Sequence, residues 1–354
     1  MDLIRHLDAD SKLFLRWIEL PYLGIEFKRV AAIGNNLWAI GGDHQIYVCK
    51  FGVEVPIRVQ EVTYENQRWN PIDGFSANLL PTDRPNFSSI DGTIARPKNG
   101  VKLPSLAWQW ESEWYVDSNF NGKTLDKQGW TWAVDFPAQY SASKGLTSCV
   151  RRRKWIRYRR YAATDSWSAV PGVHKDQAEE PFIDIAIGGN DIPNGDPDET
   201  MVWTVTVMGR VMVRQGVTAS CPEGTGWLHI NTPDGCEISQ VATSPSGLVW
   251  AVTWNGRALV RLGVSRLDPA GTGWGEVDAP ADGKSPLSHV SVGENAVWAL
   301  SRDRRVWFRN GIRAASSGDS ESMARGTKWI EMVGELSMIS VGPGDQGTLQ
   351  SGSP

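Results

Sequence analysis

The sequence has few of the residues from which metal centres, disulfide frameworks and membrane spans are built. Its 354 residues include four cysteines and five histidines, without CxxC or HxxxH spacing. The cysteines (Cys49, Cys149, Cys221 and Cys236) are far apart, so we expect reduced thiols in a cytoplasmic chain and no metal site. No run approaches the roughly 18 apolar residues of a membrane span. Any membrane contact is therefore expected to be peripheral.

Enzyme signatures are also missing. The sequence contains no GxGxxG after a strand, no GxxxxGK[ST], no HExxH and no GxSxG. Glu111 and Glu113 share one face of an aromatic strand, and we interpret them as partners of nearby arginines instead of a catalytic pair. The formal net charge of -4 argues against general nucleic-acid binding. We predict no catalytic residue, no cofactor and no nucleic-acid partner.

Tryptophan is abundant, and part of it is periodic. Among the 18 tryptophans, Trp203, Trp250 and Trp298 each follow a valine and begin a β-hairpin pattern, at spacings of 47 and then 48 residues. Flanking apolar strands and a Gly-Thr-Gly-Trp element complete four strands per repeat. This period and strand number are typical of a β-propeller blade. We predict that these tryptophans form core or inter-blade packing.

A further copy surrounds Trp38, about 130 residues before the others. We therefore predict a module inserted between the first and second blades. The expected organisation is an N-terminal segment with the first blade over 1–60, an inserted domain over 61–170, blades over 171–342 with the last one truncated, and a disordered tail over 343–354. The blades are too few for a closed ring, so we expect an incomplete ring in a truncated isoform or an incomplete gene model.

The inserted segment interleaves arginine with aromatic residues. Seven of the ten residues from Arg151 to Arg160 are basic, which fits a phosphate-binding patch or guanidinium groups stacked on rings. We favour the stacked arrangement. Its predicted members are Arg68, Trp69, Trp108, Trp110, Trp114, Trp130, Arg151, Arg153, Trp155, Arg157 and Arg159.

Several of these motifs carry a family resemblance. Residues 65–69, 114–117, 129–130, 135–136 and 151–161 resemble the two halves of a dysferlin (DysF) domain. The blades on either side resemble tectonin repeats, and the whole order is similar to the N-terminal part of the tectonin β-propeller repeat-containing family. The resemblance implies an all-β fold, with tectonin-type propeller blades in an incomplete ring and an inserted β-rich DysF domain.

The resemblance also implies a function. In that family the first DysF domain recognises sphingomyelin on the cytosolic face of damaged lysosomes, and the protein promotes autophagosome maturation. The segment that binds the autophagy conjugation machinery is not found in this sequence. We therefore expect a peripheral lipid-recognition module on lysosome or autophagosome membranes. The alternatives are a non-catalytic protein-interaction scaffold and a truncated product without the downstream effector domains.

The resemblance places the lipid contact in the loop before the arginine strand. The family has an exposed tryptophan there, and Leu146 stands at the matching position. We predict that Leu146 enters the acyl region with Phe87 and Tyr140, while Lys144 meets headgroup phosphates. Leucine lacks the indole N–H that tryptophan offers to the interface, so the lipid preference is expected to differ.

Overall fold

The computed structural model describes residues 24–174, 176, 178–313, 320–342, 344–345 and 347–350. For 320–322 and 347–350, and for the N-terminal strands, only the backbone is described. Those two strands, β1 (Asp2–Leu7) and β2 (Leu13–Ile18), pair antiparallel. The chain divides into two compact units, a propeller unit of residues 1–53 and 163–354 and an inserted unit of residues 54–162.

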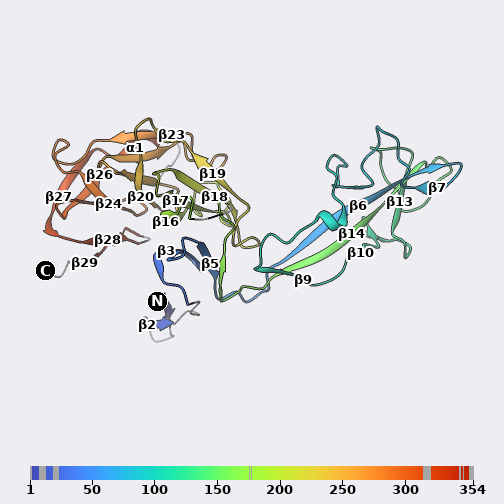
Figure 1. The fold of residues 1–354 in the computed structure, drawn as a ribbon, viewed down its shortest axis with the longest axis horizontal. Coiled ribbons are helices and arrows are strands. Elements are labelled where there is room, and N and C mark those ends of the chain that lie inside the picture. Colours follow the sequence, from blue (N-terminus) through green and yellow to red (C-terminus); the bar gives the residue numbers. More distant parts are fainter. Residues whose placement is uncertain are drawn as a thin grey trace. The chain divides into compact units, whose positions relative to one another are not determined.

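The propeller unit contains four antiparallel blades of four strands each, which confirms the predicted all-β propeller fold (Figure 1). Blade 1 contains β3 (Phe27–Ile33), β4 (Asn36–Gly41), β5 (Ile46–Lys50) and β15 (Trp167–Ala169). Blade 2 contains β16 (Phe182–Gly188), β17 (Thr200–Thr206), β18 (Val211–Val217) and β19 (Gly226–Ile230). Blade 3 contains β20 (Ile238–Thr243), β21 (Val249–Thr253), β22 (Ala258–Leu262) and β23 (Gly273–Val277). Blade 4 contains β24 (Leu287–Val292), β25 (Val297–Ser301), β26 (Arg305–Asn310) and β27 (Lys328–Glu335).

The first strands of successive blades pack against one another, β3 on β16, β16 on β20 and β20 on β24. The next strand in this series is β28 (Met338–Val341), which contacts β24. Within the described part of the propeller unit, one short α-helix, α1 (Ser320–Arg325), precedes β27. The order of blades along the chain is therefore also their order in space.

The inserted unit interrupts blade 1 instead of separating two blades. Its polypeptide leaves after β5 and returns before β15, and Trp167 of β15 pairs with Cys49 of β5. Residues 163–170, which the sequence assigned to the inserted domain, thus fall in the propeller unit. The three residues of β15 are too few to show a strand period, and only pairing with β5 identifies them as the fourth strand.

The C-terminal segment also differs from its prediction. Residues 347–350, expected to lie in a disordered tail, form β29 (Gly347–Gln350) and pair antiparallel with β28. Strand pairing relies on main-chain hydrogen bonds, so a segment without apolar alternation can still join a ladder. Residues 351–354, also assigned to the tail, lie outside the described residues.

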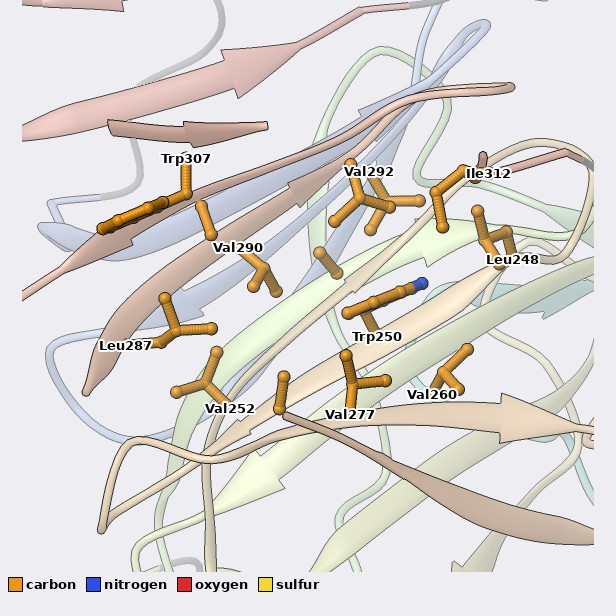
Figure 2. Close-up of a cluster of buried hydrophobic side chains, with 14 of the residues drawn as sticks. Leu248, Trp250, Val252, Val260, Val277, Leu287, Val290, Val292, Trp307 and Ile312 are labelled. Atoms are coloured by element: carbon orange, nitrogen blue, oxygen red, sulfur yellow. The ribbon is translucent and has the colours of Figure 1, made fainter. Parts of the chain in front are cut away.

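Apolar side chains of adjacent blades meet in continuous cores. In the cluster between blades 3 and 4, Trp250 is completely buried among valines, leucines and Ile312 (Figure 2). Burying one such aliphatic or aromatic side chain contributes roughly 1.5–3 kcal/mol. The repeat tryptophans Trp203 and Trp250 also contact Trp274 and Trp329 of the following blades, edge to face. Neighbouring blades are thereby joined by aromatic contacts as well as by aliphatic ones.

The inserted unit is built on two long antiparallel strands, β6 (Arg58–Asn70) and β14 (Val150–Tyr161), paired from Arg58 opposite Arg160 to Arg68 opposite Val150. Short strands extend this sheet, namely β7 (Gly74–Ser76), β8 (Phe87–Ser88), β9 (Trp108–Trp110), β10 (Tyr115–Val116) and β13 (Trp130–Ala133). A separate hairpin joins β11 (Asn119–Phe120) to β12 (Lys123–Thr124), and η1 (Lys98–Gly100) is a 3-10 turn. Strand alternation places every second residue of β14 on one face.

Candidate functional site

One face of β14 carries a row of stacked cations. We call Arg151, Arg153, Trp155, Arg157 and Arg159 the guanidinium ladder. The guanidinium carbons of Arg151 and Arg153 lie 4.0 and 4.4 Å from the ring centre of Trp130 in β13. Those of Arg157 and Arg159 lie 4.0 Å from the rings of Trp110 and Trp108 in β9. Each contact of this kind contributes about 0.5–2 kcal/mol.

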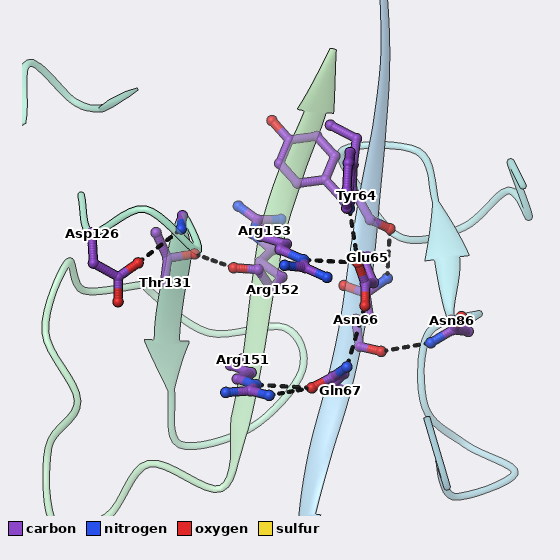
Figure 3. Close-up of polar contacts among 12 residues, drawn as sticks. Tyr64, Glu65, Asn66, Gln67, Asn86, Asp126, Thr131, Arg151, Arg152 and Arg153 are labelled. Carbon is purple, nitrogen blue, oxygen red and sulfur yellow. Dashed lines mark hydrogen bonds and ion pairs between the residues drawn. The ribbon is translucent and has the colours of Figure 1, made fainter. Parts of the chain in front are cut away.

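The neighbouring strand β6 supplies acceptors to the same row. Glu65 Oε2 accepts hydrogen bonds from Arg153 Nε and Trp155 Nε1, both at 2.8 Å. Arg159 Nε donates to Glu61 Oε1 at 2.7 Å, and Arg151 Nε donates to Gln67 Oε1 at 2.9 Å. Figure 3 shows the bonds that cross from β14 to Glu65 and Gln67. The ladder is thus paired within the sheet, which leaves it poorly suited to capture phosphate.

Three predicted members of the stack, Trp114, Trp69 and Arg68, lie elsewhere. Trp114 is half-buried and Trp69 is 48% exposed, and within residues 24–174 no cation is stacked on either indole. Arg68 bonds instead to Asp83, through Nε at 2.7 Å and Nη2 at 2.6 Å, and to Asp135. The hydrogen bond to Asp83 raises the pKa of Arg68 above its usual value. Arg68 therefore fastens the loops that contain Asp83 and Asp135 to the end of β6.

The loop over residues 134–149 holds three of the four predicted lipid-contact residues. Leu146 is fully exposed. Lys144 is exposed, with its ammonium 5.3 Å from the ring centre of Phe75. Tyr140 is half-buried and packs 4.0 Å from the guanidinium carbon of Arg152, and this burial raises the pKa of the phenol. Leu146 and Lys144 are available at the surface, whereas the Tyr140 ring is used in packing.

The fourth predicted residue, Phe87, occupies a different part of the sheet. It lies in β8 opposite Glu65, in the middle of the paired region. Its ring centre is 5.3 Å from the ammonium of Lys98, which in turn lies 3.4 Å from the ring of Trp155. Phe87 therefore borders the guanidinium ladder. The residue it pairs with, Glu65, lies four residues before Trp69 in β6, and the structure does not bring Phe87 to Leu146.

Other exposed apolar residues do gather near the loop, although the sequence reasoning missed them. Trp69 N donates to Cys149 O at 2.8 Å, and Cys149 N donates to Ala133 O at 3.1 Å. The ends of β6 and β13 and the start of β14 consequently meet at one end of the sheet. We call the exposed residues of these segments the apolar tip, which consists of Trp69, Ile72, Val134 and Leu146. No local pattern marks this set, because its members come from separate segments.

The parts of the chain that the structure describes contain no cluster of three or more histidine, cysteine, aspartate or glutamate side chains placed to hold a metal ion. None of the helices within them is long and apolar enough to cross a membrane.

Two protein families match parts of the chain. A family described as "Propeller" matches residues 201–230, 248–277 and 296–332, which correspond to blades 2, 3 and 4. A family described as "Integral peroxisomal membrane peroxin" matches residues 10–157, which include most of the inserted unit. Among solved structures, human WBSCR16 is 9% identical with a TM-score of 0.39, covering 93% of this chain and 73% of its own.

Curated relatives are similar over most of the chain. A tectonin beta-propeller repeat-containing protein of Drosophila melanogaster is 55% identical over 93% of this chain and 24% of its own length. Tectonin beta-propeller repeat-containing protein 1 of Mus musculus is 50% identical over 91% of this chain and 27% of its own. This chain thus spans about a quarter of these relatives. By this similarity and its propeller blades, it is a homologue of the tectonin β-propeller repeat-containing proteins.

Proposed function

We propose that the inserted unit is a DysF-type module that recognises membrane lipid peripherally, without catalysis, by inserting its apolar tip into the bilayer interface. The observation that carries the proposal is that Trp69, Ile72, Val134 and Leu146 are all exposed and lie in or next to segments whose backbones are hydrogen-bonded at one end of the sheet, with the cation Lys144 in the same loop as Leu146. Apolar side chains next to a basic residue are typical of proteins that bind the surface of a membrane.

The surrounding contacts support insertion of a preformed surface. Arg68 and its partners Asp83 and Asp135 hold two loops against the sheet, so little ordering is required on binding. One leucine contributes only a few kcal/mol when fully buried, and shallow insertion yields less. Four apolar side chains acting together reach a useful affinity more readily than Leu146 alone. Trp69 also supplies the indole that Leu146 lacks.

By the resemblance of the inserted unit to a DysF domain, the lipid we propose is of the sphingomyelin type, exposed on damaged lysosomes. The proposed location is accordingly the cytosolic face of lysosome or autophagosome membranes. The matched peroxin family is described as membrane-integral, and we take from it only support for a relationship to membranes.

The test is flotation of the chain with vesicles of phosphatidylcholine alone, with added sphingomyelin, or with added anionic lipid. We expect flotation with sphingomyelin and at least a tenfold loss in Leu146→Asp. Leu106→Asp is the matched control, because Leu106 is equally exposed in the same unit and lies outside the tip. Equal loss in both variants, or no flotation of the folded chain with any vesicle, would contradict the proposal.

A protein-interaction scaffold is the second candidate. It is favoured by the outer strand β27, which is longer than its counterparts in blades 2 and 3 and exposes apolar side chains.

A salt titration of vesicle binding helps to distinguish phosphate contact from apolar insertion. Binding dominated by phosphate contacts weakens strongly as salt rises, whereas apolar insertion is much less sensitive.

A further inference from the structure

The outer strand of blade 4 is an unusually long sheet edge. Within the described residues, β27 pairs only with β26, and Figure 1 shows it at the margin of its blade. It has eight residues, whereas the corresponding strands β19 and β23 have five each. An edge strand presents a row of unpaired N–H and C=O groups, and short length is one of the ways in which proteins avoid unwanted pairing there. This edge lacks that protection.

One face of β27 borders an acidic hollow of about 730 Å³. Glu331 lines it together with Asp278 and Asp282 of the loop after β23. Two basic residues, Arg309 and Lys328, also line the hollow. The buried guanidinium of Arg309 is bonded to the main chain, because its Nε donates to Arg325 O at 2.8 Å. Glu331 also lies 3.5 Å from Arg305 Nη1, so the acidic character of the hollow comes mainly from Asp278 and Asp282, with Lys328 as its exposed cation.

The other face of β27 is apolar. Ile330 lies opposite Phe308 and Met332 lies opposite Val306, and both Ile330 and Met332 are partly exposed. Val333 follows at an irregularity in the register and is fully exposed. A strand added beside β27 would direct alternate side chains to these two faces, one acidic and one apolar.

We propose that β27 accepts an extended polypeptide segment of a partner protein as a fifth strand, with basic residues on one face and apolar residues on the other. Main-chain hydrogen bonds along the edge hold the segment, and the two faces select its side chains. The acidic hollow accounts for the basic face of the segment, and Ile330 with Met332 account for its apolar face. This interaction is independent of the lipid contact at the apolar tip.

The test uses three fluorescein-labelled octapeptides and the full chain, with binding followed by fluorescence anisotropy. The first alternates lysine with valine, the second alternates glutamate with valine, and the third alternates lysine with proline, which cannot donate main-chain hydrogen bonds. We expect the lysine–valine peptide to bind at least tenfold more tightly than the other two. Equal binding of the lysine–proline peptide would show a charge attraction without strand addition and overturn the proposal.

Two variants locate the site. Val333→Lys is expected to weaken binding at least fivefold, because lysine on an edge opposes both apolar contact and a basic partner. Glu331→Gln should weaken it severalfold. Leu267→Lys is the matched control, because Leu267 is also exposed in the propeller unit but lies away from β27. Unchanged binding of the lysine–valine peptide by Val333→Lys would overturn the proposal. So would a dimer of the parent chain that Val333→Lys abolishes, because the strand beside β27 would then come from a second copy of the chain.

Discussion

Arginine and tryptophan are paired in both units, but in different ways. In the propeller unit, blades 2, 3 and 4 each bury one arginine at the same place in the repeat, namely Arg214, Arg261 and Arg309. Its guanidinium donates to main-chain carbonyls, as in Arg261 Nε to Ala270 O at 2.6 Å and Nη2 to Gly271 O at 2.8 Å. The same guanidinium lies 5.1–5.2 Å from the tryptophan of the next strand.

In the inserted unit most partners of the ladder arginines are side chains, with the bond from Arg157 Nε to Ser112 O at 2.7 Å as a main-chain exception, and these arginines remain partly exposed. Arg153 and Arg159 bond to Glu65 and Glu61, and their rings come from β13 and β9. Burial lowers the pKa of Arg214, Arg261 and Arg309 in the blades, where carbonyl dipoles replace carboxylates. The blade arginines thus fix the backbone of a turn, whereas the ladder arginines hold a thin sheet together.

The largest expected effect is the loss of a blade arginine. Arg261→Ala leaves two buried carbonyls without donors, so we expect the free energy of unfolding of the propeller unit to fall by about 3–5 kcal/mol. Urea unfolding read by hydrogen exchange in blades 2–4 measures it. Arg266→Ala, at an exposed site of the same blade, should change little. Equal effects of the two substitutions would contradict the structural role assigned to Arg261.

A smaller loss is expected in the ladder. Glu65→Gln removes the carboxylate shared by Arg153 and Trp155 and should destabilise the inserted unit by about 2–3 kcal/mol. Hydrogen exchange of β6 and β14 reports it, with the exposed Glu113→Gln as the control. If the inserted unit of Glu65→Gln instead keeps its stability and gains anion binding, the ladder is a phosphate site.

The smallest effect concerns an acid in the propeller unit. Burial raises the pKa of Asp184 to about 6, although Val241 N donates to it at 2.9 Å and Arg29 lies 3.3 Å away. A carboxyl with a higher pKa in the folded state costs stability when ionised. This cost is absent below the unfolded pKa of about 4 and complete above about pH 6.

Asp184→Asn should therefore become more stable relative to the parent chain by about 2 kcal/mol as the pH rises from 4 to 7.5. Paired thermal melts across this range measure the difference. A constant difference would show that Asp184 does not carry the expected cost, and that the propeller unit accommodates its buried charges as fully as the ladder does.

The sequence predicted much of the propeller and less of the site. Val-Trp hairpins at a spacing of 47–48 residues located blades 2–4, because strand alternation and turns are local patterns. The interruption of blade 1 was misplaced, since β15 has three residues. Leu146 was identified as a candidate contact, but Ile72 and Val134 were not, and Phe87 was grouped with residues that lie elsewhere. Exposure and proximity between segments have no local signature.

By itself, the sequence determined the all-β propeller class, the presence of an inserted segment and the interleaving of arginine with aromatic residues, because each follows from short-range periodicity and residue type. The tertiary structure alone decided which partner each arginine takes, which strand completes blade 1 and which apolar side chains share the tip. Those outcomes depend on contacts between residues far apart in the chain, such as the hydrogen bond from Trp69 to Cys149.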